Sequence, residues 1–351
     1  MRLPLRFLVT PQIVYASCGC GYRVAGENNA PWLFTQALES DFTKVTDLSH
    51  DAEWVRQQFN VTAEAGRGKY GKAFSLNNVA PKSPSLDASN SNGGIQLRVG
   101  GNVVDGAVPT AEIDSARMDM YWGSYRAGMK LTNVKGTCGA FFWYFNDTQE
   151  IDMEFLSREF DSDKKIFPVN LVVQSRASAK SGYDASKTGT YKTVNLGFNP
   201  MEAFHEYRFD YLRNKVYFYA DSKLLAEMEG NAIPDSAGHL ILQHWSNGNP
   251  KWSGGPPKED ATMTVSYVKA YFNSSHVEAT TKGLGQCKDS ASQLCDVKDV
   301  TARNASSGGE FLTNQDGKTS DDKDSAAMVP RVWPATLCGM LAMSLVMRVR
   351  G

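Results

Sequence analysis

The chain has 351 residues, 42% of them hydrophobic, which is enough to bury a sizeable core in one main domain. Its 37 Lys and Arg residues nearly balance its 38 Asp and Glu residues, and the formal net charge is -1. This balance excludes the strongly basic surface that is typical of nucleic-acid-binding proteins, and it excludes a polyanionic tail.

Residues 1–16 have the pattern of a secretory signal peptide. Arg2 and Arg6 precede a short apolar run that ends in "VYA", with small residues at the two positions that define a cleavage site. Secretion also agrees with four possible acceptors of N-linked glycans, which are Asn60, Asn146, Asn273 and Asn304. We therefore expect a secreted protein.

The middle of the chain is predicted to form strands. Ten short segments are rich in aromatic and β-branched residues and are separated by Gly, Pro, Asn and Asp clusters: 94–99, 121–131, 139–145, 150–156, 168–175, 207–212, 215–220, 223–228, 238–245 and 262–272. Neither long helical periodicity nor a fixed repeat is found. The pattern predicts an all-β sandwich of two antiparallel sheets packed face to face.

The C-terminal part changes in composition. Residues 276–331 are rich in Ser, Asp, Lys, Gly and Thr, which predicts a disordered tether. The apolar run that follows, within residues 332–351, is short for a membrane span and suits the removable tail of a glycolipid-anchor signal. A single-pass span and a plain hydrophobic terminus are the alternatives.

The cysteines fit an oxidising compartment. Cys287 and Cys295 are close enough in sequence to close a small loop, and Cys18 or Cys20 is a candidate partner for Cys138. No His lies at ligand spacing from these cysteines, which argues against a zinc site.

Three acids, Glu150, Asp152 and Glu154, alternate with apolar residues in the segment "EIDMEFL". Successive side chains of a strand point to opposite faces, so the acids share one face and the apolar residues share the other. A solvated strand face is the plainest explanation of this pattern. Like charges at neighbouring positions repel, however, and the preceding "AFFWYF" supplies aromatic side chains beside the acids. This combination favours a sugar site.

Such acids suit retaining glycoside hydrolysis. One carboxylate attacks the sugar while a second carboxyl, about 5 to 5.5 Å away, donates a proton to the leaving oxygen. Two Glu side chains on a concave sheet can lean towards each other over the shorter Asp152. Asp152 would then hold a proton or a hydrogen bond that helps to separate the pKa values of the two Glu residues.

The segment from Glu150 to Glu154 resembles the E-x-D-x-E signature of glycoside hydrolase family 16. Other segments resemble parts of the same family, including a W-H-x-Y segment in which Phe204 replaces Trp: 121–131, 204–225 and 239–257. The resemblance covers roughly residues 22–273, and we assign 17–275 to this domain. It implies a concanavalin-A-like β-jelly roll that acts on β-glucans, similar to fungal secreted members with a C-terminal membrane anchor.

The resemblance also implies a role for each acid. Glu150 would be the nucleophile, Asp152 its assisting acid and Glu154 the general acid/base. No cofactor is implied; some members carry a structural calcium ion, for which the sequence shows no feature. The spacing without an extra residue resembles lichenases, plant xyloglucan-active enzymes and fungal glucan crosslinkers more than typical laminarinases.

Substrate contacts are expected from side chains near the acids. Trp143 lies in the aromatic segment, one face of which must be core, while Trp245 and Trp252 flank a predicted loop where sugar stacking is the expected role. Three polar residues complete the candidate set: His205, His244 and Asn247. For the first of these, which matches the family's W-H-x-Y histidine, a structural hydrogen bond is the favoured role.

Three functional classes remain open. The leading hypothesis is a monomeric, endo-acting hydrolase of cell-wall β-glucan, with β-1,3 or mixed linkages, anchored at the cell surface. A glucan transglycosylase would pass the glycosyl-enzyme to another polysaccharide instead of water, and the acceptor side of the site would decide between them. A non-catalytic carbohydrate-binding sandwich is the third class, and the presence of both Glu residues argues against it.

Overall fold

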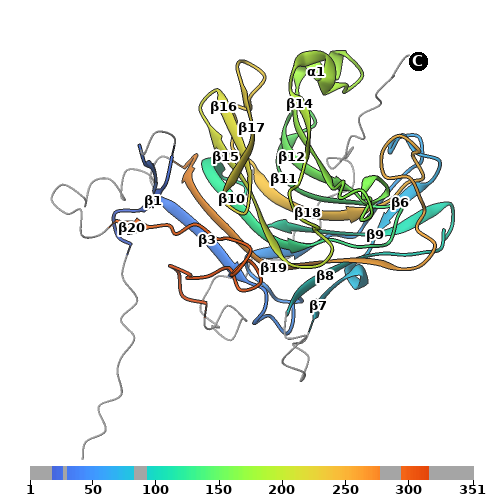
Figure 1. The fold of residues 1–351 in the computed structure, drawn as a ribbon, viewed down its shortest axis with the longest axis horizontal. Helices are drawn as coiled ribbons and strands as arrows, with labels where there is room; N and C mark the ends of the chain where they lie inside the picture. The colour runs from blue at the N-terminus through green and yellow to red at the C-terminus, as the bar shows by residue number, and fades with distance from the viewer. Residues whose placement is uncertain (1–17, 27–29, 83–92, 277–293, 316–351) are drawn as a thin grey trace, which may run out of the picture.

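Two large β-sheets pack face to face in the computed structural model, which describes residues 18–26, 30–82, 93–276 and 294–315 (Figure 1). The first sheet has nine strands, in the order β14 (Tyr191–Asn195), β13 (Pro168–Ser175), β12 (Gln149–Leu156), β11 (Cys138–Asn146), β18 (His239–Trp245), β9 (Ala107–Ser115), β6 (Gly71–Phe74) and β5 (Phe59–Val61), with β4 (Trp54–Arg56) pairing with β9. The sheet is antiparallel except for the pair β6 and β9, which is parallel.

The second sheet has eight strands, in the order β17 (Lys223–Glu229), β16 (Lys215–Ala220), β15 (His205–Leu212), β10 (Met120–Lys130), β19 (Ala261–Ser274), β8 (Gly94–Val99) and β7 (Val79–Lys82), with β3 (Gln36–Asp41) pairing with β19. A small third sheet joins β2 (Trp32–Phe34), β1 (Tyr22–Val24) and β20 (Cys295–Asp296). The helical elements are short: η2 (Leu76–Asn78), η4 (Ser157–Glu159), α1 (Arg176–Lys180) and η5 (Ala185–Thr188).

The predicted all-β sandwich is confirmed. Each of the ten predicted segments lies on a strand, namely β8, β10 to β13 and β15 to β19. Strand β9 was not predicted, since its sequence "AVPTAEIDS" contains a proline and two acids, both disfavoured in strands. It forms because its neighbours β18 and β6 supply pairing partners from distant parts of the chain.

The core lies between the two large sheets. Aromatic side chains of the nine-stranded sheet meet those of the other sheet in pairs, with ring centroids 4.6 to 5.1 Å apart: Phe155 with Tyr207, Trp143 with Tyr211, and Phe141 with Phe209. Full burial of one such side chain contributes about 1.5 to 3 kcal/mol. One face of the nine-stranded sheet is therefore fixed as core, which leaves its other face for the acids.

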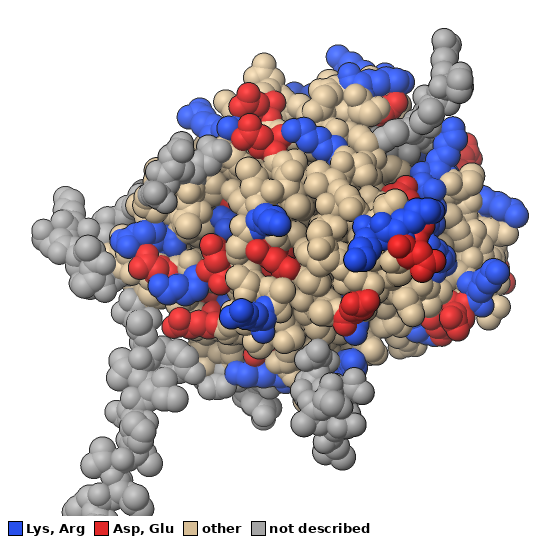
Figure 2. All heavy atoms as spheres, viewed as in Figure 1, with Lys and Arg blue, Asp and Glu red and all other residues tan. Residues whose placement is uncertain are grey.

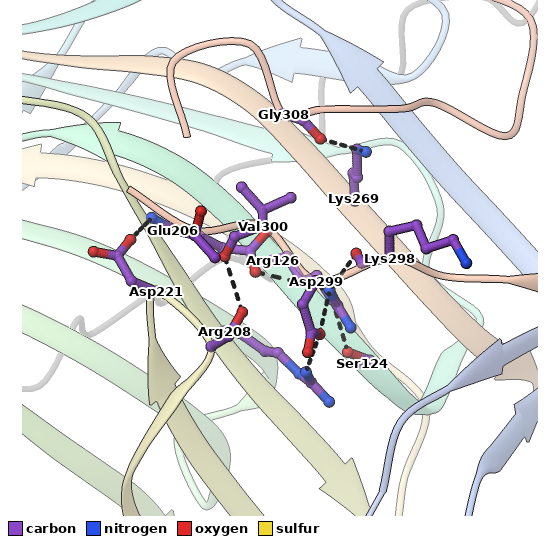
Figure 3. A network of polar contacts seen from close by, with 12 residues as sticks. Ser124, Arg126, Glu206, Arg208, Asp221, Lys269, Lys298, Asp299, Val300 and Gly308 are labelled. Atoms are coloured by element: carbon purple, nitrogen blue, oxygen red, sulfur yellow. Dashed lines mark hydrogen bonds and ion pairs between the residues drawn. The ribbon is translucent and has the colours of Figure 1, made fainter. Parts of the chain in front are cut away.

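Residues 294–315 belong to the segment for which composition predicts a disordered tether, yet they pack on the outer face of the eight-stranded sheet (Figure 3). Arg126 of β10 donates to the Lys298 carbonyl at 3.3 Å, and Lys269 of β19 donates to the Gly308 carbonyl at 2.7 Å. Val300 packs with Phe204 and with Tyr267 of β19. Sparse apolar residues combined with buried charges on the sheet thus order a segment whose composition is polar.

Cys18 and Cys295 form a disulfide that ties the start of the described chain to this segment. Cys20 is also disulfide-bonded, whereas Cys138 is a buried free thiol. The expectations that Cys138 pairs with an N-terminal cysteine and that Cys295 pairs with Cys287 are therefore wrong. Cys138 lies on β11, in the middle of the nine-stranded sheet.

Within the part of the chain that the structure describes, no helix is long and apolar enough to cross a membrane. The same described residues include no cluster of three or more His, Cys, Asp or Glu side chains suited to hold a metal ion. On the face seen in Figure 2, Lys and Arg residues are interspersed with Asp and Glu residues. The predicted signal peptide and the predicted anchor segment lie outside the described residues. Of the predicted tether, the structure describes residue 276 and residues 294–315.

Candidate active site

Strand β12 alternates as its sequence predicts. Its apolar residues join the core between the sheets: Ile151, Met153 and Phe155. Glu150, Asp152 and Glu154 point to the opposite face of the nine-stranded sheet, hereafter the acid face, yet only 5, 4 and 8% of their surfaces are exposed. Carboxyl groups are seldom fully buried unless they are paired with another group. The simple solvated strand face is therefore excluded.

The strand register places a row of residues across the acid face. Glu154 is opposite Ala140 on β11, Ala140 is opposite Gln243 on β18, and Gln243 is opposite Glu112 on β9. Adjacent strands lie about 4.8 Å apart, so the backbones at the two ends of this row are separated by roughly 14 Å along the sheet. Two carboxyl groups therefore flank a small alanine and an amide.

Glu154 is held by two donors. The indole Nε1 of Trp252 donates to its Oε1 at 3.2 Å, and the Cys138 thiol donates to the same oxygen at 3.4 Å. Burial raises the pKa of Glu154 to about 7, although both hydrogen bonds and the charge of Lys72 act in the opposite direction. The site thus contains a carboxylic acid that keeps its proton into the neutral range.

Glu150 and Asp152 form a second carboxyl pair. Burial raises the pKa of Glu150 to about 8 and raises the pKa of Asp152 well above its usual range. Their mutual hydrogen bond lowers the pKa of Glu150 and raises the pKa of Asp152, which assigns the shared proton to Asp152. The Oε2 atom of Glu150 has no hydrogen-bond partner. Glu150 therefore has one carboxyl oxygen that no other group of the protein occupies.

The structure brings two of the predicted tryptophans to the acid face. Trp252 contacts Glu154 directly, and Trp245 belongs to the same buried apolar cluster. The ammonium of Lys72, which the sequence did not single out, lies 4.6 Å from the Trp245 ring centroid. That side of the Trp245 indole is consequently covered by protein, and sugar stacking there would require Lys72 to move.

The other candidates for substrate contact are placed elsewhere. Trp143 is fully buried in the core between the sheets, where its Nε1 donates to the Met120 carbonyl at 3.1 Å. His244 points to the same side of the sheet, with its ring nitrogens bonded to the Leu97 carbonyl and Thr137. These two expectations are not met, because strand alternation directs both side chains away from the acids.

His205 and Asn247 have structural partners. His205 lies on β15 of the eight-stranded sheet, 2.6 Å from Asp221, and its ring stacks on Phe198 with a centroid distance of 3.6 Å. Asn247 is buried and donates to the Gly66 carbonyl at 2.6 Å. His205 lies on the other sheet, and its bond to Asp221 is of the structural kind that the sequence favoured. Asn247 links the loop after β18 to the segment that precedes β6.

Two segments cover the acid face. Residues 62–70 precede β6, and residues 176–190 follow β13. In the second segment, Ala185 packs in the cluster that contains Trp245 and Trp252. The guanidinium of Arg67 lies 4.5 Å from the centroid of the Tyr183 ring. Strands β12, β11, β18 and β9 lie between β13 and β6, so this contact spans the acid face.

Sequence reasoning missed Lys72, Glu112, Gln243 and Cys138. The pattern "AEIDS" in β9 repeats the acid-x-acid alternation that revealed β12, and this signal was sufficient to nominate Glu112. Gln243 is next to the predicted His244 on the opposite face of β18. Lys72 follows Gly71 in a short strand without a recognisable motif, so only the parallel pairing with β9 reveals it.

Comparison with known proteins identifies the domain. The family model described as glycosyl hydrolases family 16 matches residues 56–269, more than half of the chain. A Bacillus subtilis β-glucanase is 30% identical over 140 residues, which cover 38% of this chain and 51% of that protein. Congo red hypersensitive protein 1 of Saccharomyces cerevisiae is 24% identical over 155 residues, covering 41% of this chain and 28% of that protein.

Solved structures share the fold. A prokaryotic β-1,3-1,4-glucanase (lichenase) derived from a mouse hindgut metagenome superposes with a TM-score of 0.51 at 18% sequence identity, covering 67% of this chain and 99% of that chain. The chain spans about half the length of the bacterial β-glucanases that it matches. The likeness to the solved lichenase concerns the fold alone.

Proposed function

The chain belongs to glycosyl hydrolases family 16, and on this premise we propose that it is a retaining enzyme of neutral β-glucan chains. One observation carries the proposal: Glu150 and Glu154 lie buried on one face of β12 with Asp152 between them. Burial raises the pKa of both Glu residues, to about 8 for Glu150 and to about 7 for Glu154, and Glu150 Oε2 has no hydrogen-bond partner. These are the two groups that a double displacement needs.

In the proposed reaction Glu150 attacks the anomeric carbon and forms a glycosyl-enzyme, while Glu154 protonates the leaving oxygen. Glu154 then removes a proton from the incoming hydroxyl, which attacks the same carbon and releases a product of unchanged configuration. Attack requires ionised Glu150. Burial raises the pKa of Glu150 to about 8, while the hydrogen bond from Asp152 and the charge of Lys72 act in the opposite direction and favour the ionised form.

The charges of the acid face support a neutral polysaccharide. Glu112, Glu150, Asp152 and Glu154 share this face with one buried cation, Lys72. An anionic sugar would meet a surplus of carboxyl groups in a site of low dielectric, where repulsion is strong. A neutral glucan offers hydroxyl groups that donate to carboxylates and accept from Lys72.

The test uses the full chain with β-1,3, β-1,4 and mixed-linkage glucan oligosaccharides, and mass spectrometry identifies the products. We expect shortened products whose first-formed anomer is β, observed by NMR before mutarotation, and no product from the Glu150→Gln variant. First-formed α product would contradict the retaining mechanism. Turnover by purified Glu150→Gln would overturn the assignment of the nucleophile.

Transfer to a second glucan is the other candidate reaction, and the burial of the acids favours it. Less than a tenth of the surface of each catalytic acid is exposed, so bulk water has little access to the glycosyl-enzyme. A labelled acceptor oligosaccharide in the same assay distinguishes the two. Lengthened, labelled products would identify transfer, whereas shortened products alone would identify hydrolysis.

We also propose that the protein is secreted, monomeric and anchored at the cell surface by a C-terminal glycolipid. The disulfide between Cys18 and Cys295 supports an oxidising compartment, and the glycan acceptor Asn60 is exposed. Phospholipase treatment of membranes tests the anchor: release is expected, and retention in the membrane would contradict a glycolipid.

A further inference from the structure

Lys72 brings an unpaired positive charge to the acid face. It lies on β6, none of its surface is exposed, and its Nζ has no hydrogen-bond partner. A buried ammonium without a partner is costly, because it gives up its water without receiving acceptors in return. Buried polar atoms in native proteins are nearly always bonded, so this exception requires an explanation.

The path of the side chain indicates where the ammonium lies. Lys72 pairs with Val108 of β9, four residues before Glu112. From there the side chain passes the Trp245 indole, and its charge acts on Glu112, Cys138, Glu154 and Glu150. The ammonium therefore interacts electrostatically with Glu112 and with the two proposed catalytic Glu residues. It forms a hydrogen bond with none of them.

Other atoms of this face also lack partners. Six further side-chain atoms are buried without a hydrogen bond: Thr110 Oγ1, Glu112 Oε1, Asp114 Oδ1, Glu150 Oε2, His239 Nδ1 and Gln243 Oε1. The strand register places them on the same side of β9, β12 and β18 as the acid row. Most are acceptors, whereas Lys72 is a donor only, and hydroxyl groups of one bound molecule can satisfy both kinds.

We propose that Lys72 is a substrate-contacting residue, whose ammonium donates hydrogen bonds to oxygens of the glucosyl unit adjacent to the one attacked by Glu150. This inference rests on the proposed function and adds a residue to it. The contact is made by a positive group among carboxyl groups, so it suits a neutral, hydroxyl-rich unit. Binding provides the acceptors that the folded chain does not supply.

Binding to the full-length Glu150→Gln chain tests the contact without turnover. Calorimetry with a mixed-linkage glucan tetrasaccharide compares that chain with its Lys72→Met and Lys72→Arg derivatives. Loss of a charge-assisted hydrogen bond predicts roughly tenfold or greater weakening for Lys72→Met and a smaller loss for Lys72→Arg. The matched control is Lys223→Met, at an exposed position on β17 of the other sheet, where no change is expected.

A purely structural counter-charge is the competing explanation, and a double mutant separates the two. If Lys72 only neutralises Glu112, adding Glu112→Gln should restore the affinity lost in Lys72→Met; if Lys72 contacts the sugar, the loss should persist. Folded Lys72→Met with unchanged affinity would overturn the proposal, as would full restoration. Neither result would contradict the proposed function. That function is contradicted by a different result, in which the unmodified chain neither shortens nor transfers any glucan.

Discussion

The indole Nε1 of Trp252 donates a hydrogen bond to Glu154 Oε1 over 3.2 Å, which links the loop after β18 to the proposed proton donor. This bond lowers the pKa of Glu154, since it stabilises the ionised carboxylate. Trp252→Phe keeps an aromatic ring at this position and removes the donor. We expect the alkaline limb of the kcat/KM profile to move up by about one pH unit. An unshifted profile from a folded variant would show that the hydrogen bond from Trp252 does not set the pKa of Glu154.

Removal of Glu154, the proposed proton donor, should affect the two steps of the proposed reaction differently. Glu154→Ala should lower turnover of unactivated glucan by roughly 10²- to 10⁴-fold, the usual contribution of general acid–base catalysis. An aryl glycoside with a good leaving group needs no proton, so its first step should be nearly normal, and azide should accelerate the second step. Absence of rescue by both treatments would contradict the acid/base role.

The buried carboxyl of Glu150, the proposed nucleophile, should make stability depend on pH. The folded-state pKa of Glu150 is about 8 against an ordinary value of 4.5, so between these pH values the folded chain holds a proton that the unfolded chain has lost. This contribution to stability is complete below pH 4.5 and is lost as pH rises through the window. Glu150→Gln carries no such proton. Its Tm should match that of the parent chain at pH 4 and exceed it at pH 8.

Thermal unfolding scans from pH 4 to pH 9 measure this difference. Glu64→Gln is the matched control, because Glu64 is exposed on the loop that precedes β6, and its Tm should follow the parent chain throughout. If the Tm of Glu150→Gln stays below that of the parent chain at pH 8, ionisation of Glu150 does not destabilise the folded state.

The acids were predictable from sequence because strand alternation is local. Once "EIDMEFL" is assigned to a strand, Glu150, Asp152 and Glu154 must share a face, and the structure places them so. The preceding strand was ambiguous for the same reason. Its two faces are both aromatic, and only the packing of Trp143 on Tyr211 of the distant β15 decides which one is core.

The remaining site residues depend on long-range pairing. Lys72 and Glu112 come together because β6 runs parallel to β9, and Gln243 joins them through the pairing of β18 with β9. The acid-x-acid pattern of β9 is a local signal for Glu112, but no local signal in the chain indicates that Lys72 and Gln243 lie beside it. The polar C-terminal segment illustrates the same limit, since Lys269 and Glu39 on the sheet bond its backbone and hold it in place.

The contact between Arg67 and Tyr183 should control how long chains reach the acids. A cation–π pair contributes about 0.5 to 2 kcal/mol, so its loss should favour an open arrangement of the two covering segments by about 2- to 30-fold. Arg67→Ser combined with Tyr183→Ala should raise kcat/KM for polymeric glucan several-fold more than for a tetrasaccharide. The control is Arg213→Ser, which removes a cation–π pair with Trp122 away from the acid face. Equal effects on polymer and tetrasaccharide would show that the segments do not limit access, because a cover over the acids must hinder a long chain more than a short one.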